Sequence, residues 1–334
     1  MNIGDSQRID NPGTLSSTHL LPKDEGRDKS IRLSQILEVS LRVAEVALVV
    51  LVTLGAIGII GTASLILSSA VLGSLLLAEC AKSKLPLQAK RVISWIKATS
   101  LEMLTLPIFI PTYFIRLEKN NPDMRDLKEK KPLVIAAHGY LHNSSAWIYG
   151  KRRLQNAGLP FVTLTKSSLF GSIDRYAEQI QALSGKYFEY IKENGVVLLG
   201  HSMGGVATCK AAVLMQKNPE IKNKIQVITL GSPLQGTGLA KIGIGQCARE
   251  MQSNSPYLNE LNEEITKAEE TVDFHHFGSE VDCIVPHRSS TRSSSEGNHK
   301  TYTLDELGHL GLLLSDRVYD QIINTIDSQK LIQP

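Results

Sequence analysis

The chain has 334 residues, a net charge of +3 and 42% hydrophobic residues, which allows one or two domains with a substantial apolar core. The small net charge, with no Lys/Arg block interleaved with aromatic residues, argues against a nucleic-acid partner. The four cysteines are widely spaced without a Cys-x-x-Cys pair, and the histidines are scattered. This pattern indicates reduced thiols, no metal site and no cofactor.

The first 40 residues are polar and include a mixed-charge run from Lys23 to Lys29, which predicts a disordered tail over 1–40. Residues 46–78 carry no charged side chain. One straight helix over them would be about 50 Å long, whereas the hydrocarbon core of a bilayer is about 30 Å thick. We therefore expect a hydrophobic α-helical membrane hairpin over 41–80. A single tilted span and a buried helix pair of a soluble protein are the alternatives.

Basic residues flank the apolar segment, among them Arg42 before it and Lys82 and Lys84 after it. The positive-inside rule places both flanks, and with them the rest of the chain, on the cytoplasmic side of the membrane. Residues 81–131 are predicted to form a basic or interfacial linker. Two prolines interrupt its apolar stretch 101–115 and exclude a regular spanning helix, so this stretch is expected on the membrane interface or packed under the next domain.

From residue 132 onward the pattern alternates between strands and helices. The predicted strands cover 133–137, 161–164, 196–199, 225–230, 272–277 and 300–303. An amphipathic helix begins near Ile173 and ends at Asn194-Gly195. Alternating units of this kind predict one compact α/β domain over 132–330, with about six mostly parallel strands covered by helices. The insert 233–271 is short, which favours a small lid.

The pentapeptide Gly200-His201-Ser202-Met203-Gly204 lies between an apolar run and a stretch rich in small residues. A strand, a sharp turn and a helix around G-x-S-x-G are the context of a nucleophile elbow, which exposes the serine hydroxyl above the sheet. The helix N-terminus beneath the serine favours developing negative charge. Although the bare pattern also arises by chance, its context predicts that Ser202 is a nucleophile.

A serine nucleophile needs a base, an orienting carboxylate and an oxyanion hole. Where the serine lies on such an elbow, the acid and then the base follow it in the chain. Asp282 follows a late strand and is the candidate acid, with Glu280 as runner-up. His309 follows the final strand and is the candidate base. His299 starts that strand, at the wrong edge of a parallel sheet, and His287 follows the acid too closely.

The oxyanion hole is expected to consist of two backbone N–H groups. One belongs to Met203, the residue after the nucleophile. The other lies in the loop after the first strand of the domain, His138-Gly139-Tyr140, where Gly139 lets the backbone turn and the Tyr140 N–H is the donor. We interpret His138 as a buried structural histidine.

Together these motifs resemble the bacterial triacylglycerol-lipase and esterase branch of the α/β-hydrolases. The resemblance covers about 132–330 and rests on His138-Gly139-Tyr140, Gly200 to Gly205, Thr229 to Pro233 with Gly236-Thr237, Asp282 with Val285-Pro286, and Gly308-His309. It implies a triad of Ser202, Asp282 and His309, with Tyr140 and Met203 as oxyanion donors.

The resemblance also implies which residues line the substrate pocket, namely Gly139, His201 and Leu234. Leu234 stands where this branch often has a histidine, and residues 1–120 have no counterpart in secreted lipases. The expected protein is a membrane-anchored ester hydrolase without a cofactor, acting on a lipid or another ester and facing the cytoplasm. An acyltransferase or thioesterase with the same triad, and a non-catalytic membrane adaptor that keeps the fold, are the alternatives. The sequence carries no signal for the oligomeric state.

Overall fold

The computed structural model describes residues 114–127, 130–292 and 299–328 and the single residues Ser94, Ala98, Glu102 and Thr112. The chain divides into two compact units, 1–48 and 49–334, and every described residue belongs to the second. The predicted tail over 1–40 and the predicted hairpin over 41–80 lie outside the described residues. In the part that is described, no helix combines the length and the apolar composition that crossing a bilayer requires.

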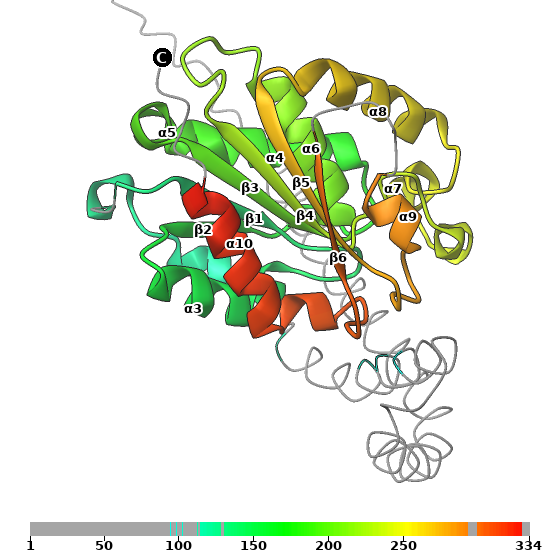
Figure 1. Ribbon diagram of the computed structural model, residues 1–334. Coiled ribbons are helices and arrows are strands. Elements are labelled where there is room, and N and C mark those ends of the chain that lie inside the picture. The colour runs from blue at the N-terminus through cyan, green and yellow to red at the C-terminus, as the bar shows by residue number, and fades with distance from the viewer. Residues whose placement is uncertain are drawn as a thin grey trace, which may run out of the picture. The chain divides into compact units, whose positions relative to one another are not determined.

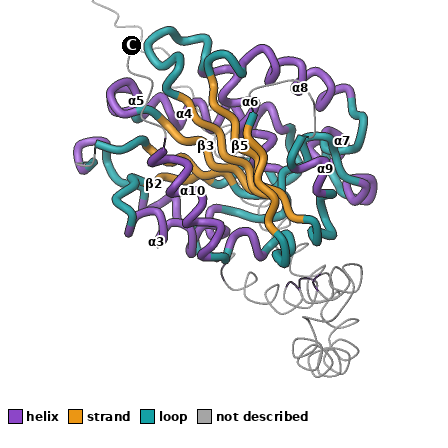
Figure 2. The backbone as a smooth tube through the Cα atoms, in the orientation of Figure 1, coloured by secondary structure: helices purple, strands orange, loops and turns teal. Residues whose placement is uncertain are grey.

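Six strands form one sheet, in the order β2-β1-β3-β4-β5-β6, and each neighbouring pair is parallel. The strands are β1 (Leu133–Ala137), β2 (Phe161–Leu164), β3 (Val196–His201), β4 (Ile225–Leu230), β5 (Val272–Ser279) and β6 (Lys300–Leu304). All six predicted strands are confirmed, although β3, β5 and β6 continue slightly beyond their predicted ends. Figure 2 shows these strands crossing the domain between helices.

Strands β1 to β4 are buried on both faces of the sheet, which explains why they are largely apolar, whereas the edge strand β6 is mostly exposed. In β1 the side chains of Leu133, Ile135 and Ala137 belong to one hydrophobic core. Those of Val134 and Ala136 belong to a second core on the other face. Since successive side chains of a strand point to opposite faces, one short apolar run supplies both cores.

Helices cover both faces, as Figure 1 shows. The first core contains residues of α4 (Ile173–Lys186), α5 (Phe188–Asn194), α6 (Met203–Met215), α7 (Gln246–Glu250) and α8 (Pro256–Ala268). The second contains residues of α3 (Ile148–Asn156) and α10 (Asp316–Ser328). The insert 233–271 holds a 3-10 turn, Gly238–Ile242, together with α7 and α8, and the short α9 (His287–Ser290) follows β5.

The single helix predicted between Ile173 and Asn194 is instead two helices, so that prediction is wrong in one respect. The chain leaves helical geometry at Tyr187, with φ −113° and ψ 20°. The Tyr187 hydroxyl donates a hydrogen bond of 2.8 Å to the carbonyl of Pro122. This contact with a distant segment lies at the break between the two helices. The spacing of apolar residues in the sequence does not indicate that break.

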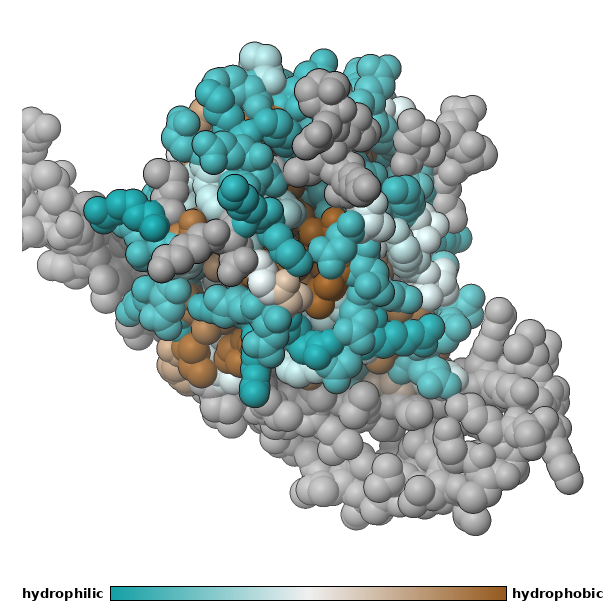
Figure 3. All heavy atoms as spheres, turned by 60° about the vertical axis from the view of Figure 1, so that its left-hand side comes forward, coloured by the Kyte–Doolittle hydropathy of each residue, from teal (hydrophilic) through white to brown (hydrophobic). Residues whose placement is uncertain are grey.

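The face of the molecule that Figure 3 brings forward is largely hydrophilic, with hydrophobic side chains in small patches among polar ones. Such a surface is expected where amphipathic helices turn one side to the core. In α4, for example, Ile173, Tyr176 and Ile180 are completely buried.

Candidate active site

The turn between β3 and α6 has the strained geometry expected of a nucleophile elbow. Ser202 adopts φ 54° and ψ −128°, which residues other than glycine seldom adopt. Its backbone N–H donates to the carbonyl of Leu230 at the end of β4, at 2.9 Å. Ser202 is thus held above the sheet at the start of a helix.

The glycines of the pentapeptide are required because α6 approaches the sheet very closely. A Cβ atom added to Gly200 would lie 2.3 Å from the Cα of Gly205, and one added to Gly204 would lie 2.2 Å from the carbonyl oxygen of Ala137. Both neighbours are backbone atoms, which cannot move aside as a side chain can. The close approach brings the helix N-terminus under Ser202.

The candidate acid and base are in direct contact. Nδ1 of His309 donates a 2.7 Å hydrogen bond to Oδ2 of Asp282, and both side chains are buried. The other oxygen, Oδ1, accepts from the backbone N–H groups of Ile284 and Val285 at 2.8 and 2.9 Å. Since an ionised carboxylate only accepts, Nδ1 carries the proton and Nε2 is left as the basic nitrogen.

Charges around His309 oppose the effect of its burial. Burial acts to lower the pKa of the imidazole, but the charge and hydrogen bond of Asp282 and the charge of Glu102 act to raise it, and the pKa is raised above its ordinary value of 6.5. His201 packs against this ring at a centroid distance of 4.6 Å. Burial and the nearby His309 hold the pKa of His201 well below its usual range, so His201 is neutral and its Nε2–H donates to the carbonyl of His309 at 3.0 Å.

The serine lies beside the acid–base pair without being bonded to it. Among the described residues no hydrogen bond joins Ser202 Oγ to His309. A Cβ atom added to Gly231 would lie 3.1 Å from Asp282 Oδ2 and 3.2 Å from His309 Nδ1, and the residue before it, Leu230, accepts the Ser202 N–H. Because such bonds are often long in enzymes without substrate, the pairing of Ser202 with His309 stays a prediction.

The loop after β1 touches the elbow. A Cβ atom added to Gly139 would lie 3.0 Å from Ser202 Cβ. Within the described part of the chain, the backbone N–H groups of Tyr140 and Met203 donate no hydrogen bond, as two oxyanion donors require. The Tyr140 hydroxyl bonds to both backbone groups of Ile244 at 2.8 Å, which ties this loop to the insert.

The rival candidates lie elsewhere. Glu280 is exposed. His287 Nε2 lies 2.9 Å from Thr303 Oγ1, and His299 Nε2 donates to the carbonyl of Arg292 at 3.0 Å. Asp282 and His309, the carboxylate and imidazole chosen from the sequence, do meet.

His138 has the structural role expected of it. Its Nδ1 donates to the carbonyl of Gly139 at 2.8 Å, and its Nε2 accepts from the backbone N–H of Lys166 at 3.0 Å. Burial lowers its pKa to about 3, so it stays neutral. Leu234 is buried, and its carbonyl accepts from Asn262 Nδ2 at 2.8 Å. That Leu234, Gly139 and His201 contact substrate stays a prediction.

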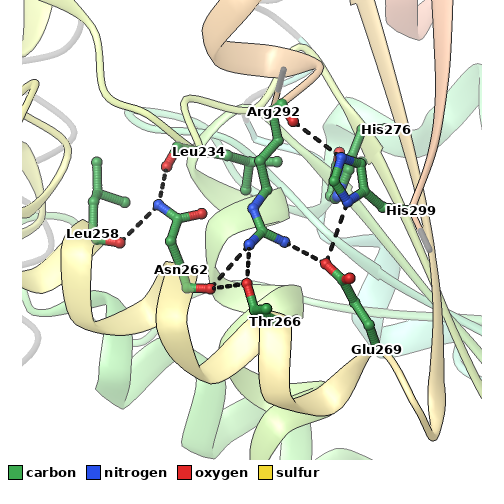
Figure 4. Close-up of polar contacts among 9 residues, drawn as sticks. Leu234, Leu258, Asn262, Thr266, Glu269, His276, Arg292 and His299 are labelled. Carbon is green, nitrogen blue, oxygen red and sulfur yellow. Dashed lines mark hydrogen bonds and ion pairs between the residues drawn. The ribbon is translucent and has the colours of Figure 1, made fainter. Parts of the chain in front are cut away.

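A buried polar network anchors the loop that carries the acid (Figure 4). Arg292 lies beyond α9, and its guanidinium donates to Glu269 at 2.8 Å, to Thr266 Oγ1 at 2.7 Å and to the carbonyl of Asn262 at 3.0 Å. His299 lies between the carbonyl of Arg292 and the Glu269 carboxylate. The network ties the far end of the Asp282 loop to α8.

One residue next to the base was not anticipated from the sequence. Oε1 of Glu102 accepts a 2.7 Å hydrogen bond from the backbone N–H of Leu310. The available signal was that Glu102 is the first acidic residue after Glu79, at the head of an apolar stretch. This pattern does not indicate which residue Glu102 contacts, so the contact with Leu310 could be recognised only in the folded structure.

The candidate residues gather at one edge of the sheet. Tyr140 follows β1, Ser202 follows β3, Asp282 follows β5 and His309 follows β6. Because the strands are parallel, their carboxyl ends meet at the same edge, where open α/β sheets bind ligands. The sheet order and the elbow are consistent with the α/β-hydrolase fold.

Comparison with known proteins finds similarity to lipases. The family model described as lipase (class 3) matches residues 121–244. The chain is similar to lipase B of Aspergillus fumigatus, with 17% identity, a TM-score of 0.50, and coverage of 59% of this chain and 52% of that one. It is also similar to the mature form of the lipase BlEst2 of Bacillus licheniformis, with 13% identity, a TM-score of 0.49, and coverage of 59% and 92%. No curated protein matches the chain.

Residues 121–244 are similar to the class 3 lipases, and the fold is similar to that of the Aspergillus fumigatus lipase. The chain spans about half the length of the Aspergillus fumigatus lipase B chain. The likeness in structure shows the fold.

Proposed function

We propose that this protein is a serine hydrolase that cleaves carboxylic esters, lipid esters first among them, and that the predicted hairpin over 41–80 holds it at a membrane. The observation that carries the proposal is the buried 2.7 Å hydrogen bond between His309 and Asp282, at the sheet edge where Ser202 occupies its strained turn. The match to class 3 lipases supports the same chemistry.

The reaction follows from the roles of these groups. Nε2 of His309 takes the proton of Ser202 as Oγ attacks the ester carbonyl carbon, and Asp282 stabilises the imidazolium that forms. The backbone N–H groups of Tyr140 and Met203 bind the oxyanion. Loss of one such donor typically costs about 2.7–4 kcal/mol of transition-state stabilisation.

Collapse of the tetrahedral intermediate breaks the bond to the alcohol, which leaves with the proton from His309. The acyl group remains on Ser202 as an ester. A water molecule then gives its proton to His309 while its oxygen attacks the acyl carbon. The second intermediate releases the acid and returns the proton to Ser202.

Two features favour a lipid substrate. The predicted hairpin would keep the domain close to a bilayer. In the insert Leu239, Ile242 and Ile244 are exposed to 47%, 82% and 58%, and the backbone of Ile244 bonds to Tyr140, beside the candidate oxyanion donor. Because one fold serves many substrates, the acyl length and the alcohol have to be measured.

The test compares the purified full chain, in mild detergent, with Ser202→Ala on short-chain p-nitrophenyl esters. We expect hydrolysis by the wild type and a loss on the order of 10⁴-fold or more in the variant, since the nucleophile is removed. A fluorophosphonate probe should label the wild type alone. Ser328→Ala, at the end of α10, is the matched control and should retain the wild-type rate.

Equal rates in the wild type and Ser202→Ala would refute the assignment. Product analysis with an added alcohol or with acyl-CoA tests the alternatives. Preferential transfer to the alcohol, or faster cleavage of the thioester, would replace the ester hydrolase by an acyltransferase or a thioesterase. A folded protein that neither hydrolyses any of these substrates nor reacts with the fluorophosphonate probe would support the non-catalytic adaptor.

A further inference from the structure

Glu102 precedes the hydrolase domain in the chain, yet it contacts the loop of the base. Its carboxylate accepts the Leu310 N–H at 2.7 Å, across 208 positions of sequence. Glu102 has helical backbone, as do Ser94 and Ala98, which precede it at intervals of four residues. Ala98 is fully buried and Glu102 is partly buried.

The peptide group between His309 and Leu310 is held at both ends. Its carbonyl accepts from His201 Nε2 at 3.0 Å, and its N–H donates to Glu102 at 2.7 Å. Because a peptide group is planar, fixing both ends fixes its plane and the direction in which the neighbouring imidazole leaves the backbone. Asp282 then sets the rotation of the ring through Nδ1.

Gly308 leaves the space that this contact needs. A Cβ atom added there would lie 2.4 Å from Cδ and from Oε1 of Glu102, so the carboxyl group rests against the backbone just before the base. Any side chain at position 308 would push it away. The negative charge of Glu102 also reaches the imidazole, where it acts with Asp282 to raise the pKa of His309 against the effect of burial.

We propose that Glu102 is a positioning residue of this active site and that the catalytic unit extends N-terminally at least to Glu102. The inference rests on the proposed function. Glu102 does not touch substrate. It fixes the backbone from which the His309 imidazole reaches Ser202.

The experiment uses the full chain and separates the hydrogen bond of Glu102 from its charge. Glu102→Ala removes both, and we expect kcat to fall about 10- to 100-fold with little change in KM, as misplaced catalytic groups do. Glu102→Gln keeps an acceptor oxygen for Leu310, so kcat should stay close to the wild-type value. Its acid limb of kcat/KM should move to lower pH, because among the described residues Asp282 is then the charge that raises the pKa of His309, and His201 beside it is neutral.

A second variant changes Gly308, the residue against which the Glu102 carboxyl group packs. Gly308→Ala should displace the Glu102 carboxyl group and lower kcat as Glu102→Ala does. In the double variant the second change should add little, because residues acting through one contact are not additive. Glu263→Ala, an exposed glutamate of α8, is the matched control and should leave kcat unchanged.

Measurements without turnover keep this inference separate from the proposed function. The NMR signal of the proton between His309 and Asp282 should persist in Glu102→Gln and weaken in Glu102→Ala and Gly308→Ala, whether or not esters are cleaved. An unchanged signal together with an unchanged kcat in Glu102→Ala overturns the inference, and so does full additivity of the two changes. If Glu102→Ala fails to fold, Gly308→Ala and Glu102→Gln decide by the same criteria.

Discussion

Asp282 meets two demands with its two oxygens. Oδ1 closes the turn after β5 by accepting two backbone N–H groups, and Oδ2 orients His309. An aspartate in such a loop is commonly a turn residue, and here the turn also directs the second oxygen toward His309, the candidate base. Glu280 lies two residues earlier and is exposed.

Replacing Asp282 by Asn should lower kcat on the order of 10⁴-fold, as in other triads, because the amide favours the wrong tautomer of the base. The pH dependence should also change. His309 must be neutral to accept a proton, so the wild-type rate falls as the pH drops through a pKa that Asp282 raises above 6.5. Loss of that charge moves the acid limb to lower pH.

The measurement is a profile of kcat/KM against pH for the wild type, Asp282→Asn and the control Glu280→Gln. The control should keep both rate and profile. A profile of Asp282→Asn that moves to higher pH, or a large loss in Glu280→Gln, would contradict the assignment of the acid.

At the scale of elements, the elbow depends on how closely α6 packs on the sheet. Gly204→Ala would put a Cβ 2.2 Å from the backbone oxygen of Ala137. We expect a loss of about 1–3 kcal/mol of unfolding free energy, as for other overpacked sites, and a displaced Ser202 with a much lower rate. Urea unfolding and ester hydrolysis measure the two effects.

The matched control is Gly185→Ala in α4, where an added Cβ meets nothing within 4 Å. It should leave the rate unchanged and gain up to about 1 kcal/mol, because alanine is the better helix former. If Gly204→Ala is as stable and as active as this control, the prediction is wrong, because α6 can then move away from the sheet to accommodate the added methyl group.

The second prediction at the scale of elements concerns how much the buried Arg292 network contributes to stability. Arg292 and Glu269 each expose 6% of their side chains, so Arg292→Met leaves a buried carboxylate without its main partner. Breaking such a pair typically costs about 3–5 kcal/mol. The double variant Arg292→Met with Glu269→Leu should recover part of this loss, because the uncompensated charge is gone.

Chemical unfolding of Arg292→Met, of the double variant and of a control measures the change in unfolding free energy. Arg125→Met is the control, since Arg125 and its partner Asp123 are mostly exposed and surface pairs contribute little. A double variant that is no more stable than Arg292→Met would mean that packing, and not the buried charge, dominates at this site.

At the scale of the whole molecule, the proposed hairpin over 41–80 leads to a prediction about how the chain meets a membrane. Both termini should lie on the same side, so protease should reach N- and C-terminal tags together in sealed vesicles. Deletion of 41–80 should release the protein in an alkaline wash. Tags protected on opposite sides would favour the single tilted span, and a full-length chain released by the wash would favour a buried helix pair.

Much of the fold was predictable because its signals are local. Burial on both faces makes β1 and β3 short apolar runs. The apolar run before Gly200, followed by G-x-S-x-G, predicts a strand, a turn and a helix. Because Ser202, Asp282 and His309 each follow a strand, and parallel strands end at one edge of the sheet, all three were expected at that edge.

The sequence by itself determined the six strands, the elbow and the candidate acid and base, because periodicity and motif spacing act over a few residues. The tertiary structure alone decided the contact between Asp282 and His309, the break at Tyr187 and the arrival of Glu102 beside the base. Each of these depends on a partner distant in the chain. Which distant groups meet is set by the packing of whole elements, and no local pattern encodes it.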